Sequence, residues 1–292
     1  MALVDETRLR RHLENLCFLR SQVLNPGAVR RAALYIEEEF RSYGLSVDTD
    51  EFSHWLTAWH RNKNIVARST RSDPQAPCLI IGAHYDAVPF SPGADDNGSG
   101  VSVLLEAARI LSQAEPPLLL QVRFVAFAME ECGFIGSLHY VKTLKKSGIP
   151  VAGMLSLECV GYTSRRPESQ IIPPGLPIQV PDRGDFIGIV GNTDSGALKD
   201  GLESAIHQYA PELKAVSLLV PANGQDLPET RLSDHSPFWD AGYPALLITD
   251  TAFLRNPHYH RPSDRIETLD FAFMCHLTQA IIALPNILSR SL

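Results

Sequence analysis

The stretch GAHYDAVPFSPGADDNGSG, residues 82–100, determines the fold and the site that we predict for this chain. His84 and Asp86 end an apolar run, and if that run is a strand their side chains lie on one face. An imidazole ligand and its supporting carboxylate would then be aimed together. Asp95 and Asp96 follow a Pro-rich turn and precede residues that tolerate tight backbone geometry. Oxygen donors in this setting suggest an ion site above a sheet.

The composition of the chain favours one globular domain over residues 1–292. With 292 residues and 45% hydrophobic residues, the chain can bury a large core. A net charge of -7 and a pI near 5.8 argue against a nucleic-acid or membrane partner. We expect no signal peptide and no segment apolar enough to span a bilayer. The five cysteines are widely spaced. We therefore expect a cytoplasmic protein with reduced thiols, whose oligomeric state is left open.

Apolar residues at helical spacing predict two amphipathic helices at the start of the chain, over residues 7–24 and 29–44. Strands near 45–52 and 64–68 come before the strand that ends at His84. Helices and strands then alternate, with a helix from Val101, strand 118–129, helix 135–146, strand 152–157, strand 185–190, helix 196–209, strands 215–219 and 245–249, and a closing helix that Pro285 is expected to kink.

This alternation predicts an α/β fold, a three-layer α/β/α sandwich with a central mostly parallel, mixed sheet. Two irregular stretches, residues 163–183 and 221–232, are expected to be ordered loops that shape a pocket. In such sheets function gathers beyond the carboxyl ends of the strands, where Glu130, Glu131 and Glu158 fall.

Each candidate residue also has an ordinary structural interpretation. Asp95 and Asp96 could cap the helix that follows them. Glu130 and Glu131 could be a solvated strand end, although adjacent anions repel unless a cation or proton relieves them. In the functional interpretation one carboxylate binds a metal and the other activates the water that the metal binds. Three histidines near the C-terminus could each be a ligand, a supporting group or a surface residue: His235, His258 and His260.

Six motifs in order across residues 79–270 resemble the zinc exopeptidases of the bacterial leucyl aminopeptidase type. This family includes glutamate carboxypeptidase and the glutaminyl cyclases, and its fold is the phosphorylase/hydrolase-like zinc peptidase fold. The motifs are GAHYD, GADDNGSG, MEECGFIGS, LECVGY, SDHSPFW and PHYHRPSD. The motifs span nearly the whole predicted catalytic domain. They follow the family order at compatible spacings, which argues against a chance resemblance.

The resemblance implies a centre of two zinc ions, with one ion as an alternative. His84 would bind one ion and His260 the other, and Asp95 would bridge them through a loop with a cis Asp95–Asp96 peptide bond. Glu131 and Glu158 would complete the ligand set. The family more often has aspartate at the position of Glu158, and glutamate could alter metal spacing or occupancy. The implied catalytic residues are Glu130 as general base, Tyr259 as a group that stabilises the tetrahedral intermediate, and Asp86 behind His84.

We therefore predict an aminopeptidase that acts on peptides or amino-acid amides. A glutaminyl cyclase is one alternative, but that branch typically has tryptophan before the final histidine, where this chain has Tyr259. A carboxypeptidase would need a cation for the terminal carboxylate, such as Arg231, Arg165 or Arg166. An inactive binding domain is the non-enzymatic alternative. Two cysteines beside the candidate ligands, Cys132 and Cys159, are expected to be small core residues that face away from the site.

Overall fold

The computed structural model describes residues 4–57, 60–69, 75–115 and 117–289. Its centre is a mixed sheet of eight strands in the order β1-β2-β4-β3-β5-β8-β6-β7. The central strands β4, β3, β5 and β8 are parallel, whereas β2 and β6 run antiparallel to the neighbours β4 and β8. The strands are β1 (Ser46–Phe52), β2 (Asn62–Arg68), β3 (Cys78–His84), β4 (Gln121–Phe127), β5 (Val151–Glu158), β6 (Ile187–Asn192), β7 (Ala215–Val220) and β8 (Ala245–Thr249).

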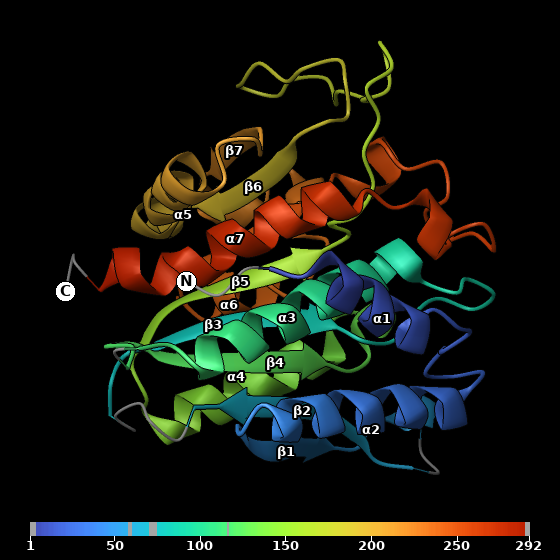
Figure 1. The fold of residues 1–292 in the computed structure, drawn as a ribbon, viewed down its shortest axis with the longest axis vertical. Coiled ribbons are helices and arrows are strands. Elements are labelled where there is room, and N and C mark those ends of the chain that lie inside the picture. Colours follow the sequence, from blue (N-terminus) through green and yellow to red (C-terminus); the bar gives the residue numbers. More distant parts are fainter. Residues whose placement is uncertain (1–3, 58–59, 70–74, 116, 290–292) are drawn as a thin grey trace.

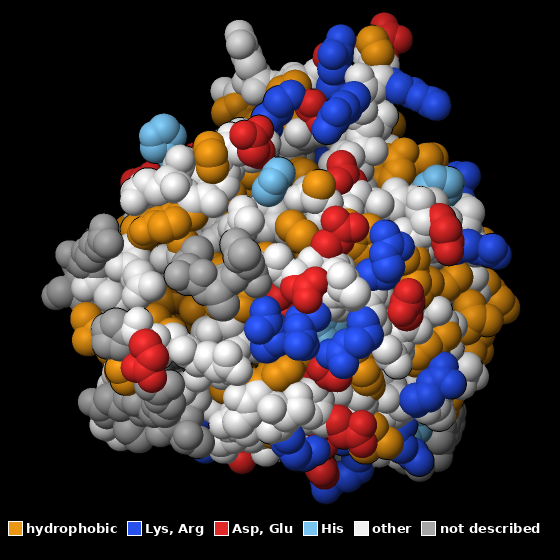
Figure 2. Space-filling view, in the orientation of Figure 1, with side chains coloured by type: hydrophobic (Ala, Val, Ile, Leu, Met, Phe, Trp, Pro, Cys, Tyr) orange, Lys and Arg blue, Asp and Glu red, His pale blue; other side chains and the backbone are white. Residues whose placement is uncertain are grey.

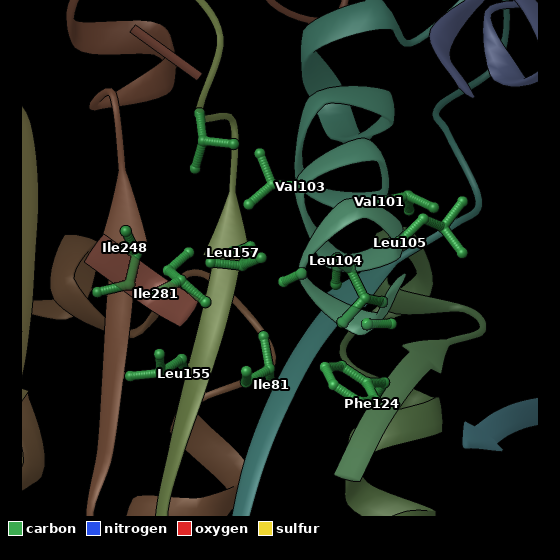
Figure 3. Close-up of a cluster of buried hydrophobic side chains, with 14 of the residues drawn as sticks. Ile81, Val101, Val103, Leu104, Leu105, Phe124, Leu155, Leu157, Ile248 and Ile281 are labelled. Atoms are coloured by element: carbon green, nitrogen blue, oxygen red, sulfur yellow. The ribbon is translucent and has the colours of Figure 1, made fainter. Parts of the chain in front are cut away.

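Helices cover both faces of the sheet, which confirms the predicted three-layer α/β/α sandwich (Figure 1). One layer contains α1 (Glu6–Leu16), α2 (Pro26–Ser42), α3 (Gly100–Ser112), α5 (Gly196–Tyr209) and α7 (Phe271–Leu288), and the other contains α4 (Ile135–Ser147) and α6 (Ser236–Asp240). In the larger core, strand side chains such as Ile81 and Leu155 face the helices that carry Leu104 and Ile281 (Figure 3).

The first helix is shorter than the sequence pattern predicts. It ends at Leu16 rather than near residue 24, and a non-helical segment leads to α2. Asn25 begins α2, because its side chain accepts a hydrogen bond from the Ala28 amide and Pro26 occupies the first helical position. The residues between the two helices are not helical, and Arg20 among them is buried.

The closing helix α7 corrects the expectation that no segment is apolar enough to span a bilayer. By length and composition its 18 residues are sufficient, and 61% of them are buried inside the protein. The helix continues through Pro285 to Leu288. It packs against α5, α3 and α1, as expected of a core helix.

Charged side chains of both signs are interspersed over the face of the molecule shown in Figure 2. Apolar side chains lie between them. The excess of acidic over basic residues in the sequence gives the chain its net charge of -7.

The parallel strands bring the predicted site residues to one edge of the sheet. β3 ends at His84 and β5 at Glu158, and β4 is followed by a short 3₁₀ turn, Glu130–Cys132. Because β6 is antiparallel to β8, the irregular segment 163–183 before β6 enters from this same edge. The sheet therefore collects ligands and loop around a common space.

A buried histidine between α1 and α2 predicts acid sensitivity that does not involve the site. His12 is fully buried, and its Nδ1 lies 2.7 Å from the Tyr35 hydroxyl. Burial and the neighbouring charges of Arg11 and Arg8 lower the pKa of His12 to about 3. Between this value and the ordinary pKa of about 6.5 the unfolded chain binds the extra proton, so stability is full above pH 6.5 and falls as the pH decreases.

For metal-free protein, we expect His12→Gln to remove much of this acid sensitivity. From pH 7 to pH 4 the histidine should cost the wild type about 3 kcal/mol of unfolding free energy, and the variant should not lose this part. Urea denaturation at both pH values measures the difference. An equal decrease in both proteins would show that His12 is not the group responsible.

Candidate metal centre

Asp96 lies at the centre of a buried group of carboxylates and imidazoles. Its Oδ1 is 3.2 Å from Nε2 of His84, and its Oδ2 is 2.9 Å from Nε2 of His260. One carboxylate oxygen is thus directed to each histidine. The prediction that Asp95 holds this position is wrong by one residue.

Asp95 instead faces away from the histidines and supports the surrounding backbone. Its Oδ1 accepts a hydrogen bond from the Gly161 amide at 2.9 Å, and its Oδ2 accepts one from Nδ2 of Asn256 at 2.7 Å. The cis peptide bond lies between Asp96 and Asn97, not between Asp95 and Asp96. Adjacent aspartates project in different directions, and the sequence spacing alone does not distinguish them.

Glu158 is directed to His84. Both of its carboxylate oxygens lie 3.3 Å from His84 Nε2, and Ser233 donates a hydrogen bond to Oε2 at 2.8 Å. The carboxylate of Glu130 is also near, with 3.8 Å between Oε2 and the same nitrogen. His84, Glu130 and Glu158 form a group whose donor atoms all lie within 4.8 Å of one another.

Glu131 accompanies His260 on the other side of Asp96. Its Oε2 is 3.5 Å from His260 Nε2, and its Oε1 accepts a hydrogen bond from the Val88 amide at 3.0 Å. The ring of Tyr259 stacks on His260 with 3.8 Å between centroids. Tyr259 therefore stands at the border of the metal-ligand group.

Asp86 lies behind the group, next to His84 and Glu130. Its Oδ1 is 3.6 Å from Nδ1 of His84, which is longer than a hydrogen bond, and it accepts one from the Glu130 amide at 3.2 Å. The side chains of His84 and Asp86 are both fully shielded from solvent. This one carboxylate thus contacts the predicted ligand and the backbone of the predicted base.

The electrostatics of the site favour a bound cation. Burial, with the nearby charges of Glu158 and Glu131, raises the pKa of Glu130 well above its ordinary value. Burial also raises the pKa of Glu131, and the charge of Asp96 adds to that effect. For His84, burial lowers the pKa, but the charges of Glu158 and Glu130 outweigh it and raise the pKa well above its ordinary value. The carboxylates therefore repel one another unless positive charge is placed between them.

The donor set fits divalent metal ions such as zinc. Imidazole nitrogens and carboxylate oxygens are common zinc ligands, and Asp96 Oδ1 and His84 Nδ1 are buried without a hydrogen-bond partner within the described part of the chain. His84, Asp96 and Glu131 form a second group with donor atoms within 4.8 Å. The residues present can therefore hold a metal centre.

The other two candidate histidines do not join this group. His235 is buried, with its Nε2 2.8 Å from the Thr230 carbonyl and its ring against Trp239. His258 contacts the Ser263 hydroxyl through Nδ1 at 3.0 Å. They are a core residue and a loop residue, respectively.

The two cysteines beside the ligands differ in their surroundings. Cys132 packs against the hydrophobic core. Cys159 does not face away from the site, because its Sγ lies 3.4 Å from Oε1 of Glu158 and belongs to a third close group with Asp96. A positive φ of 49° at Cys159 turns the chain immediately after β5.

Several buried polar residues around the ligands were not among the predicted site residues. Ser233 and Asn256, described above, hold Glu158 and Asp95. Asp234 is fully buried, and burial raises its pKa to about 7. The motif SDHSPFW contains two of these residues, Ser233 and Asp234, but only its histidine was a candidate ligand. Nothing in the pattern distinguishes Asn256 from an ordinary turn residue.

An apolar cavity opens beside Glu158 and Tyr259. Its volume is about 160 Å³, and the segments 163–183 and 221–232 contribute to its walls, as predicted. The floor is formed by strand residues that include Val190, Leu218 and Leu247. No Lys or Arg is among the described residues that line it.

A mixed α/β sheet with a buried group of potential metal ligands at its carboxyl edge and an adjoining cavity can support the chemistry of a metal-dependent hydrolase. Comparison with known proteins makes this specific: residues 64–284 match peptidase family M28, and the chain belongs to that family. It is 37% identical to the uncharacterised Escherichia coli protein YfbL over 271 residues, or 88% of this chain and 79% of YfbL.

Two solved structures extend the comparison. The zinc aminopeptidase BSAP of Bacillus subtilis is 29% identical with a TM-score of 0.59, over 77% of this chain and 50% of that one. This chain thus spans about half of BSAP. The glutaminyl cyclase of Porphyromonas gingivalis is 20% identical with a TM-score of 0.67, over 96% of both chains, and shows the fold alone.

Proposed function

We propose that this protein is a zinc-dependent aminopeptidase with two co-catalytic ions. The observation that carries the proposal is the position of Asp96, with one carboxylate oxygen toward His84 and the other toward His260. Glu158 accompanies the first histidine and Glu131 the second. The residues thus form two half-sites that share one aspartate, and the zinc aminopeptidase among the similar structures supports the choice of metal.

Glu130 is the residue assigned to proton transfer. When bound, zinc supplies Lewis-acid polarisation of the scissile carbonyl and lowers the pKa of a water molecule. The Glu130 carboxylate accepts the proton of the attacking water and returns it to the leaving amine. The Tyr259 hydroxyl is assigned to the oxygen that becomes negative in the tetrahedral intermediate.

The apolar cavity supports an apolar side chain at the N-terminus of the substrate. A volume of about 160 Å³ is close to that of an engineered apolar cavity of about 150 Å³ that binds benzene. A leucyl or phenylalanyl side chain therefore fits, whereas an anionic one would lose its hydration without a Lys or Arg in the lining to pair with. We expect leucine and phenylalanine to be preferred over glutamate.

The alternatives have less support. Arg231, a candidate cation for a carboxypeptidase, is paired with Asp240 at 2.7 Å and donates to the Asn223 carbonyl. Arg165 and Arg166 are not among the residues that line the cavity. Tyr259, in place of tryptophan, does not favour the cyclase. The inactive binding domain has no support from loss of a ligand or base, since all are present.

The test is metal content together with activity on protein purified without chelator. We expect about two zinc ions per chain and chelator-sensitive release of leucine from leucyl amide, with glutamyl amide cleaved more slowly. A glutaminyl peptide is assayed on the same sample. One ion with cyclisation alone would establish the cyclase. Absence of both activities after zinc is restored would overturn the proposal.

A further inference from the structure

A buried arginine outside the family-matched region connects the N-terminal segment to the metal site. Arg20 lies in the non-helical segment between α1 and α2, and it is fully buried. Its guanidinium donates to backbone carbonyls: Nε to Tyr85 at 2.9 Å, Nη1 to Leu16 at 2.8 Å and to Pro92 at 2.5 Å, and Nη2 to Gly93 at 2.7 Å. Within the described part of the chain, the hydrogen bonds of this guanidinium all go to backbone carbonyls.

These contacts hold both ends of the loop that carries the ligands. Tyr85 stands between His84 and Asp86, and Gly93 comes shortly before Asp96. The backbone of Arg20 contributes as well, because its carbonyl accepts a hydrogen bond from the Ala87 amide at 3.3 Å. One side chain therefore fixes the distance between the strand end that presents His84 and the turn that presents Asp96.

The packing around the guanidinium leaves little space for rearrangement. A Cβ added at Gly93 would lie 2.4 Å from the Asp96 carbonyl oxygen and 2.8 Å from Nη1 of Arg20. Gly93 also has a positive φ of 65°, which favours glycine. The planar fork of arginine presents five N–H donors in a rigid geometry, which lysine cannot reproduce.

We propose that Arg20 is a positioning residue of the metal centre, which sets metal affinity by holding the loop between His84 and Asp96. This inference deepens the proposed function and rests on its assignment of those two residues as ligands. The segment before the family-matched region is thus part of the site and not a separate appendage.

The test is metal binding by Arg20→Lys, which keeps the charge but not the fork. Supporting groups around metal ligands typically change affinity by about 10- to 100-fold, and we expect a loss of this size for Zn²⁺ and for Co²⁺. The visible absorption of bound Co²⁺ should also shift, because it reports ligand geometry. In Arg20→Ala, ethylguanidinium should restore part of the affinity by occupying the vacated space.

Arg109→Lys is the matched control. Arg109 donates through Nε and Nη2 to the buried Glu106, both at 2.7 Å, near the end of α3. It lies about 13 Å along the helix axis from Gly100. This variant should lose stability, measured by urea unfolding of the metal-free chain, with unchanged metal affinity and Co²⁺ spectrum.

Equal metal affinity and an equal Co²⁺ spectrum in wild type and Arg20→Lys would overturn the inference. If neither Arg20 variant folds, Gly93→Ala provides the second test, because the added Cβ would meet both the Asp96 carbonyl and the guanidinium. Normal metal binding in that variant would show that the centre does not need this packing and would overturn the inference too. These measurements do not depend on turnover. Failure of the wild type to hydrolyse leucyl amide would contradict the proposed function and leave the role of Arg20 to be judged by affinity.

Discussion

Glu130→Gln is expected to keep the fold and the metal content of the protein while losing about 10²- to 10⁴-fold in kcat, the range typical of a lost general base. Glutamine has nearly the same size as glutamate but cannot accept a proton from water. The backbone amide of residue 130 would still donate to Asp86, so the turn that carries the side chain should remain in place. Steady-state hydrolysis of leucyl amide and zinc content on the same samples measure both parts of the expectation.

The neighbouring residue gives a matched control for this experiment. Glu131→Gln changes the same functional group one position along the chain, but Glu131 accompanies His260 as a proposed ligand. That variant should lose metal, and excess zinc should restore part of its activity. Full activity in Glu130→Gln would show that Glu130 is not the general base. Loss of zinc in both variants would show that Glu130 is a ligand instead.

The fold could be predicted from the sequence because periodicity and strand ends are local signals. The apolar run before His84 and the one before Glu130 indicated buried strands, and parallel pairing brings their ends to one edge. The end of α1 was not predictable in this way. Arg20 continues a helical charge pattern in the sequence, whereas in the structure it is buried by contacts with residues more than 60 positions away.

For the site, residue types were predictable but directions were not. His84, Glu131, Glu158 and His260 meet as expected, since each lies next to a strand end or within a recognisable motif. The choice between two adjacent aspartates depends on backbone dihedral angles. Asp96 has φ of -104° and ψ of 93° inside the turn, a conformation that spacing does not reveal.

Asp96→Asn and Asp95→Asn should separate the shared ligand from its neighbour. At position 96 one charged oxygen becomes an amide NH₂ that cannot bind a cation, so both half-sites lose a ligand or its charge. Substitution of a supporting residue typically lowers metal affinity by about 10- to 100-fold, and we expect Asp96→Asn to exceed this loss. Activity should be lost at ordinary zinc concentrations. Asp95→Asn should stay within that range, because Asp95 acts through the Gly161 amide and Asn256.

The two variants make the same substitution at adjacent buried positions, so the comparison of their metal affinities tests which aspartate lies between the two histidines. Asp95 and Asp96 are both buried, and both amides donate to the Asp264 carboxylate, a contact that neither substitution removes. Titration of metal-free protein with zinc gives the affinities, and urea unfolding without metal gives the stability. Without metal, Asp96→Asn should be the less stable of the two. Contacts with His260 and His84 outweigh burial and lower the pKa of Asp96, whereas burial and the charge of Asp250 raise the pKa of Asp95. Weak binding by Asp95→Asn with normal binding by Asp96→Asn would restore Asp95 as the bridge and contradict the geometry of the turn.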